Sequence, residues 1–309
     1  MDIYTQLQSR LNGYRAKFKM VSVDHIGDLE SEYLQLFKNS LVDKQLYEKY
    51  IKGYIDFSIK EKHPSVRSLI ITATPSPQVE LKFKMKGKDT WFKIPPVYTD
   101  RLLVTRRIKE ITSQVFDNNG YKTFSVVLPK KLIAVHSGLA EYGKNNLVYV
   151  KGMGSYNRLT LYATDLPCKN DSWQSLKQLK RCKKCYTCQN NCPTSAIGKD
   201  NFIVKAERCL AYYNERAGQF PDWIDSMAHN CLIGCIKCQD VCPENSKYTS
   251  PLRHKEEFNE EETNMILNNI SFEELPINLQ AKISSLCLKY YYKHLSRNIL
   301  PLIQNKNEQ

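Results

Sequence analysis

Apolar and polar residues follow two periods along the first half of the chain, and these predict both helices and strands. Apolar residues recur at helical spacing from Tyr4 to Tyr14 and again over 99–116, which predicts two amphipathic helices. The almost wholly apolar segment 68–77 predicts a buried strand that ends at prolines. Further strands are expected at 121–128, 145–151 and 158–166. Alternating strands and helices predict an α/β domain.

The segment 79–94 predicts a β-hairpin. Leu81, Phe83 and Met85 alternate with lysines, and Gly87 lies in the expected turn. Lysines at every second position place three charges on one face of a strand. Such a face is typical of a solvated surface or of an edge strand protected against aggregation.

The order of these patterns predicts three regions. An α/β cofactor-type domain is expected over 1–167, and a cysteine-rich, ferredoxin-like module over 168–250. The tail over 251–309 is acidic at first and is expected to be helical throughout.

Charge and hydrophobicity narrow the class of protein. No run of eighteen apolar residues predicts a membrane span, and the N-terminus lacks an apolar signal core, so a cytoplasmic protein with no membrane partner is expected. The formal net charge is +13, and residues 51–200 carry 26 Lys and Arg against 11 Asp and Glu. A basic middle region is compatible with RNA, an anionic cofactor, an acidic redox partner or ordinary solubility charge.

The chain has eleven cysteines, and most of them lie between Cys182 and Cys242. In a reducing compartment, such clustering favours metal binding over disulfides. The first run reads C-x2-C-x2-C-x3-C-P, which is the bacterial ferredoxin pattern for a 4Fe–4S cluster. In two-cluster ferredoxins the fourth cysteine of that run ligates the other cluster, so the run predicts a second cluster.

A second run supplies it, because C-x2-C-x3-C-P recurs near residue 240. With mutual exchange of ligands, the first predicted cluster takes Cys182, Cys185, Cys188 and Cys242. The second takes Cys192, Cys235, Cys238 and a fourth thiol, which is either Cys209 or Cys231. Spacing alone favours Cys231. Two zinc sites are the alternative, but zinc usually takes two separated pairs of ligands, unlike these runs.

The segment Leu132–Cys168 resembles the epoxyqueuosine reductase family. The family pattern A-x-R-A-G-L-G-x-x-G-K-N, a G-S pair and a strand ending in T-D-L match at Ala134, Ser137, Gly138, Leu139, Gly143, Lys144, Asn145, Gly154, Ser155, Thr164 and Asp165. The cysteine runs, the segment around Cys209 and the terminal segment 296–303 follow the order of the family as well.

The resemblance implies a cobalamin-dependent iron–sulfur reductase that acts on a modified tRNA base. It implies a corrinoid held by Ser137, Gly138, Gly143, Lys144, Asn145, Gly154 and Ser155, two 4Fe–4S clusters that supply electrons, and Cys209 as the eighth cluster ligand. Glycines let backbone approach a planar ligand, and Lys144 would meet a phosphate. A tight turn between helix and strand explains the same glycines without a ligand.

The chain lacks the acidic residue of the family pattern. The family carries an aspartate about ten residues before the position of Ala134, whereas this chain has no carboxylate between Tyr121 and Lys131. The arginine of the family motif is His136 here, which titrates near neutrality or serves a structural role.

Three functions remain open at this point. The first is an iron–sulfur oxidoreductase in which the clusters feed a bound corrinoid and an unidentified substrate. The second is an epoxyqueuosine reductase acting on tRNA, and the third is an electron-transfer protein with no substrate of its own. A ferredoxin or flavodoxin-like electron donor is the expected partner.

Overall fold

The computed structural model describes residues 1–99, 101–198 and 203–307. The chain forms two compact units, each of which is discontinuous in sequence. Unit 1 consists of Met1–Pro75, Leu103–Tyr186 and Ile197–Glu207; unit 2 consists of Ser76–Leu102, Thr187–Ala196 and Arg208–Gln309. The mixed α/β architecture expected from the sequence is confirmed.

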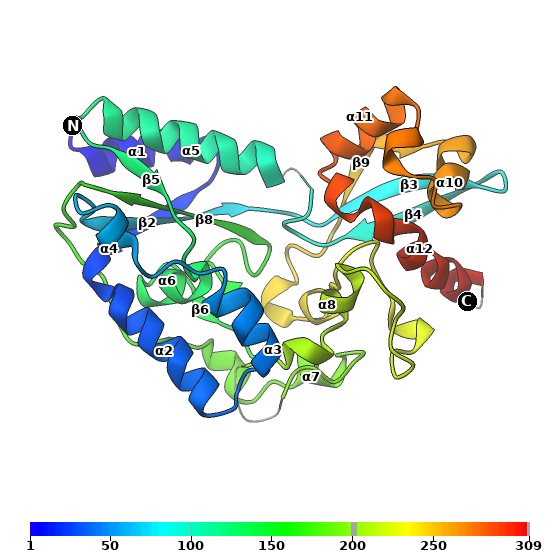
Figure 1. The fold of residues 1–309 in the computed structure, drawn as a ribbon, viewed down its shortest axis with the longest axis horizontal. Helices are drawn as coiled ribbons and strands as arrows, with labels where there is room; N and C mark the ends of the chain where they lie inside the picture. Colours follow the sequence, from blue (N-terminus) through cyan, green and yellow to red (C-terminus); the bar gives the residue numbers. More distant parts are fainter. Residues whose placement is uncertain (100, 199–202, 308–309) are drawn as a thin grey trace. The chain divides into compact units, whose positions relative to one another are not determined.

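Unit 1 is built on a four-stranded antiparallel sheet in the order β1-β2-β8-β5 (Figure 1). These strands are β1 (Lys17–Ser22), β2 (Ser68–Pro75), β8 (Asn157–Thr164) and β5 (Thr123–Ser125). The predicted apolar strand is the internal strand β2, and it is buried along nearly its whole length. A strand buried on both faces needs apolar residues without alternation, which explains its sequence.

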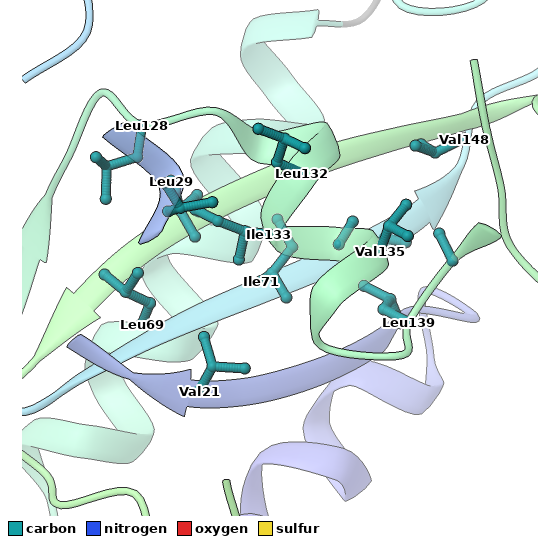
Figure 2. Close-up of a cluster of buried hydrophobic side chains, with 14 of the residues drawn as sticks. Val21, Leu29, Leu69, Ile71, Leu128, Leu132, Ile133, Val135, Leu139 and Val148 are labelled. Atoms are coloured by element: carbon teal, nitrogen blue, oxygen red, sulfur yellow. The ribbon is translucent and has the colours of Figure 1, made fainter. Parts of the chain in front are cut away.

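Helices cover both faces of this sheet. Leu69 and Ile71 pack in the core with α2 and α6, and Figure 2 shows α6 lying across that face. Ile70 packs on the opposite face with α1 and α5, because successive side chains of a strand point to opposite sides. The covering helices are α1 (Ile3–Asn12), α2 (Ile26–Lys38), α5 (Arg101–Asp117) and α6 (Lys130–His136). Truncation of Ile71 to alanine is expected to cost about 2–5 kcal/mol.

The remaining elements of unit 1 are short. A separate hairpin is formed by β6 (Glu141–Tyr142) and β7 (Val148–Tyr149), so the predicted strand over 145–151 belongs to a different sheet from β8. The others are α3 (Lys44–Tyr47), the π-helix η2 (Glu48–Lys52), α4 (Ile59–Lys62) and the 3₁₀ turns η1 (Val23–His25) and η3 (Lys180–Lys183); a further turn, η4 (Ala206–Arg208), ends where the chain leaves this unit.

Unit 2 contains a three-stranded sheet in the order β4-β3-β9. The predicted hairpin is confirmed as β3 (Val79–Met85) and β4 (Lys88–Ile94). The prediction of a helix from about Pro251 is wrong at its start, because β9 (Leu252–Phe258) pairs parallel to β3. The second side of β3 offers backbone N–H and C=O groups that β4 does not pair. Hydrogen bonding to this side stabilises a strand here and overrides the weak helical preference of the segment.

The strand that carries the predicted lysine face, β3, does not lie at the edge of the sheet. β3 lies between two partners, and Lys82 forms ion pairs with Asp89 of β4 at 3.3 Å and Glu257 of β9 at 2.7 Å. The opposite face is apolar, where the rings of Phe83 and Phe258 stack with centroids 4.4 Å apart.

The helices of the tail complete the apolar core of unit 2. They are α10 (Glu260–Leu267), η7 (Phe272–Glu274), α11 (Ile277–Ser285), η8 (Lys289–Tyr291) and α12 (Tyr292–Asn307). The cysteine-rich part of the unit contains only short helical turns: α7 (Thr187–Asn190), α8 (Leu210–Asn214), η5 (Ser226–Ala228), α9 (Lys237–Asp240) and η6 (Pro243–Asn245). Among the described residues, no helix is long and apolar enough to span a bilayer.

Candidate metal centre

The eight predicted cluster ligands lie in or beside short helical turns. Cys182 lies in η3, Cys188 in α7 and Cys238 in α9, whereas Cys209 and Cys242 occupy the N-cap positions of α8 and η6. None of the eleven cysteines is in a disulfide. Short turns of this kind present several thiols and backbone N–H groups toward one space, as cluster binding requires.

Three thiols predicted for the second cluster lie close together in unit 2. The charges of Cys209 and Cys192 both raise the pKa of Cys235, and the charge of Cys192 raises the pKa of Cys209. Burial is the larger cause in both residues, and the pKa of Cys235 rises to about 11. Buried thiols of this kind are neutral at pH 7 unless a metal stabilises their thiolate forms.

Hydrogen-bond donors already point at two of these sulfurs. The backbone N–H of Ala196 donates to Cys192 Sγ at 3.3 Å, and the amide of Asn230 donates to Cys235 Sγ at 3.2 Å. Donors to cluster sulfurs stabilise negative charge and tune reduction potential. The donor set and its surroundings therefore fit an iron–sulfur cluster.

Cys209 and Cys231 differ in their surroundings. Cys231 is fully buried, and its thiol donates to Asn230 Oδ1 at 3.3 Å. Burial raises its pKa well above the usual range, and the charge of Cys235 adds to this effect. Cys209 is partly exposed and interacts electrostatically with both Cys192 and Cys235. Both thiols therefore interact with Cys235, but Cys209 interacts with Cys192 as well, whereas Cys231 is fully buried in the core.

A mononuclear site has stricter needs than a cluster. Zinc requires its ligands within about 2.0–2.3 Å of one ion. In the part of the chain that the structure describes, no three His, Cys, Asp or Glu side chains converge closely enough to hold a single ion. A 4Fe–4S cluster takes its thiolates at separate irons, so its ligands do not converge on one point.

Buried asparagines fix the loops that carry these thiols, and the sequence patterns did not reveal them. Asn298 of α12 donates to the carbonyls of Asn214 and Leu232, both at 2.9 Å. Asn214 in turn donates to Gly234 O at 2.7 Å, one residue before Cys235. The only signal in the sequence was that Asn298 directly precedes the apolar residues 299–303. Removing such an amide leaves buried carbonyls without a donor.

The glycine-rich segment of unit 1 reaches the first cysteine run through Lys144. Its side chain is buried, and Nζ lies 3.9 Å from the centroid of the Tyr186 ring, between Cys185 and Cys188 in sequence. This is a cation–π contact at short range. The ammonium that was predicted to meet a phosphate therefore lies against the cysteine loop.

The glycines of this segment serve internal packing. A Cβ on Gly138 would lie 2.4 Å from the side-chain nitrogen of Gln174, and one on Gly143 would lie 2.4 Å from the ring of Tyr149. Asn145 donates to Tyr149 Oη at 3.1 Å, and the Ser137 hydroxyl donates to Ala134 O at 3.1 Å. Gly154, another predicted cofactor residue, closes a tight turn in which its backbone exchanges two hydrogen bonds with that of Val150. Ser155, the last of these residues, follows directly.

The space around the predicted corrinoid-binding residues is largely occupied by protein. The space beside both glycines is filled by protein side chains, and neither of two cavities in unit 1, of about 570 and 290 Å³, is lined by the seven predicted residues. In this structure Gly138 and Gly143 serve internal packing, and a corrinoid held by this segment stays a prediction.

The position where the family resemblance predicts an acid is Phe124 in β5, and the loop that follows, from β5 to α6, has only apolar residues and a proline. Its Val127 carbonyl accepts a hydrogen bond from the backbone of Asp56 at 2.9 Å. Hydrogen bonds from Lys62, and then from Ser58, lower the pKa of Asp56, so this carboxylate is ionised at neutral pH. Asp56 therefore does not hold a proton for delivery.

Residues 181–245 match the model of a 4Fe–4S double cluster binding domain. An epoxyqueuosine reductase of Cyclobacterium marinum is 38% identical over 173 residues, covering 55% of this chain and 52% of the relative. One of Atelocyanobacterium thalassa is 33% identical over 139 residues, covering 43% of this chain and 44% of the relative. The chain thus spans about half the length of these curated relatives.

Solved structures agree over a longer part of the chain. Epoxyqueuosine reductase of Streptococcus thermophilus superposes with a TM-score of 0.68 at 19% identity, covering 99% of this chain and 82% of the other. An epoxyqueuosine reductase solved with a tRNA-Tyr stem loop gives 0.70 at 19% identity, with 98% and 82% covered. The chain therefore has the fold of the epoxyqueuosine reductases and resembles that family in sequence around its two cysteine runs.

Proposed function

We propose that this chain is an iron–sulfur reductase acting on the epoxide of a modified base in tRNA. The observation that carries the proposal is the pair of cysteine runs inside a domain that matches a double cluster binding model, in a chain with the epoxyqueuosine reductase fold. A tRNA substrate is preferred over an unidentified one, because the relatives are named for activity on epoxyqueuosine.

The proposed reaction consumes two electrons and two protons. The epoxide oxygen leaves as water, both of its carbon–oxygen bonds break, and a carbon–carbon double bond remains. Two 4Fe–4S clusters supply electrons when bound, one cluster held by Cys182, Cys185, Cys188 and Cys242 and the other by Cys192, Cys209, Cys235 and Cys238. The electrons would come from a ferredoxin or flavodoxin-like donor.

The residues of the chain have three roles in this proposal. Asn230 and Ala196 stabilise the thiolates of the second cluster by donating to their sulfurs. The basic region over 51–200 attracts the phosphates of tRNA, which predicts binding that weakens steeply with salt. The β5–α6 loop offers no carboxylate to protonate the leaving oxygen, and Asp56 is ionised, so neither supplies the protons.

Cobalamin stays a prediction that rests on the family resemblance alone. Ser137, Gly138, Gly143 and Asn145 make internal contacts, and no step of the proposed reaction is routed through a corrinoid. Cobalt and iron analysis of anaerobically purified protein, before and after reconstitution with cobalamin, tests both cofactors in one experiment.

The deciding experiment uses a tRNA anticodon stem loop that carries epoxyqueuosine. Reconstituted protein and a chemical reductant should convert the base to a product lighter by one oxygen atom, as measured by mass spectrometry of the nucleosides. Cys192→Ser should abolish conversion together with part of the iron. Absence of conversion by protein that holds both clusters and supplied cobalamin would reject the proposal.

A second function is supported by the acid-free loop between β5 and α6. In that case the chain passes electrons to a protein partner and does not reduce a base itself. Reduced clusters would then be reoxidised by an electron-acceptor protein at the same rate with and without tRNA.

A further inference from the structure

Trp173 lies between two histidines in unit 1. Its ring stacks on His25 with centroids 4.2 Å apart and an interplanar angle of 3°, and on His136 at 4.3 Å and 9°. The three residues come from separate parts of the chain: His25 ends η1, His136 ends α6, and Trp173 lies beyond β8. The indole is therefore held on both faces.

Only acceptors face the two imidazoles. Nδ1 and Nε2 of His25 lie 3.0 and 2.8 Å from the carboxylates of Asp28 and Asp171. His136 Nε2 lies 2.7 Å from Glu32 Oε1, and its Nδ1 lies 2.6 Å from the carbonyl oxygen of Gln174. A neutral imidazole has one N–H, so all four contacts are satisfied only when both rings are protonated. Two imidazolium ions then face the π surfaces of one indole.

Hydrogen bonds continue from this stack along the segment that follows it. The backbone N–H of Gln174 donates to His136 O at 2.9 Å, and the hydroxyl of Ser172 donates to Ser137 O at 2.9 Å. Further on, Tyr142 exchanges backbone bonds with Lys177 and Leu179, at 2.8 and 2.9 Å. The N–H of Cys182 then donates to Leu179 O at 3.0 Å. The segment 171–179 thus joins the stack to the first predicted cluster ligand.

We propose that His25, Trp173 and His136 form a pH-dependent clasp that positions the segment 171–179, and with it the loop of Cys182, on unit 1. When His136 loses its proton, one of its nitrogen lone pairs faces an oxygen lone pair, and the cation–π attraction on that face of Trp173 is lost. The clasp is therefore closed at low pH and loosens as pH rises. The clasp itself does not depend on the proposed function. Only its consequence does, namely that the cysteine loop it positions would carry electrons.

The charges around the clasp are mainly acidic. Burial, the largest influence, lowers the pKa of His136, but the hydrogen bonds with Glu32 and Gln174 outweigh it and raise that pKa above its usual value. The neighbouring elements contribute these further titratable or charged groups: Asp24, Asp28, Tyr33, Lys60, Tyr142, Cys168 and Asp171. Lys60 is engaged with Asp24 at 2.7 Å, so the carboxylates nearest the rings remain available to them.

Hydrogen–deuterium exchange of the anaerobically purified full chain tests the clasp. After correction for intrinsic rates, peptides covering 171–179 should lose protection by on the order of tenfold between pH 6 and pH 8.5. His136→Gln should show the loosened state at both pH values, and His25→Gln, which removes one stacking partner of Trp173, should lower protection at both. His63→Gln is the matched control, because His63 packs against Phe124 outside the clasp, with ring centroids 4.8 Å apart, and this variant should behave as wild type.

The outcomes separate the clasp from ordinary packing and from the proposed activity. Equal protection of 171–179 at both pH values in wild type, or a pH response that persists in both variants, would overturn the clasp. His25 is more exposed than His136, so His25→Gln keeps the test valid if His136→Gln fails to fold. Since the readout uses neither tRNA nor electron flow, failure of the reductase assay leaves this result unaffected.

Discussion

Lys144 Nζ lies 3.9 Å from the centroid of the Tyr186 ring, which ties the glycine-rich segment to the first cysteine run. A positive charge next to a cluster favours its reduced form. Lys144→Met is therefore expected to make the potential of the cluster held by Cys185 and Cys188 more negative, on the order of tens of millivolts. Redox titration followed by electron paramagnetic resonance measures the shift.

Lys131→Met is the matched control for that prediction. Lys131 donates to the carbonyl of Asn146 at 3.0 Å in the same segment, so its replacement removes a positive charge nearby. Equal shifts in the two variants would mean that Lys144 acts through general charge and not through its contact with Tyr186.

Crossed ligation predicts a specific pattern of iron loss. Cys242→Ser and Cys185→Ser should each remove about one of the two clusters, and the double variant should lose no more, because both residues serve the same cluster. Cys242→Ser combined with Cys238→Ser should lose both clusters. Iron analysis of the four proteins decides the matter, and retention of one cluster in the last variant would show that the ligands are not exchanged.

The eighth ligand is tested by a pair of single variants. Cys209→Ser should lose the second cluster, since this thiol interacts with both Cys192 and Cys235. Cys231→Ser should keep its iron and lose only stability, because the residue is fully buried in the core. The opposite result, with iron lost in the Cys231 variant alone, would assign that thiol instead.

His229 predicts acid sensitivity of unit 2. Burial, followed by the charge of Arg297, lowers its pKa to about 4 from an unfolded value of 6.5. A lowered histidine pKa means that the unfolded chain takes up a proton first, so stability falls as pH drops from 6.5 toward 4 and then levels off. The loss approaches about 3 kcal/mol at most.

His229→Gln should remove this pH dependence. Unfolding by urea, followed by circular dichroism at pH 7 and pH 4.5, should show a smaller drop in the variant than in wild type. Acid damage to the clusters affects both proteins alike, so the difference between them isolates the histidine. An equal drop would mean that His229 is not the group responsible.

The sequence by itself predicted much of the secondary structure of unit 1 and the chemistry of the cysteine runs. Segment 68–77 had to be a buried strand, because an unbroken apolar run satisfies two covered faces. The spacing of Cys182 to Cys192, followed by proline, predicted two clusters because ligand exchange follows from local geometry, and the matched domain model agrees. The region boundaries at 167 and 250 stay predictions, while the compact units interleave along the chain.

Only the tertiary structure decided which partners these residues meet. The acidic start of the tail became β9 because β3 offered a pairing side that no local pattern announces. His136 read as a solitary histidine, yet the fold brings Glu32, Trp173 and Gln174 to it from distant parts of the sequence. Periodicity and spacing predict local secondary structure and which face of a segment is buried. They do not predict which distant segment packs against that face, because this depends on the fold of the whole chain.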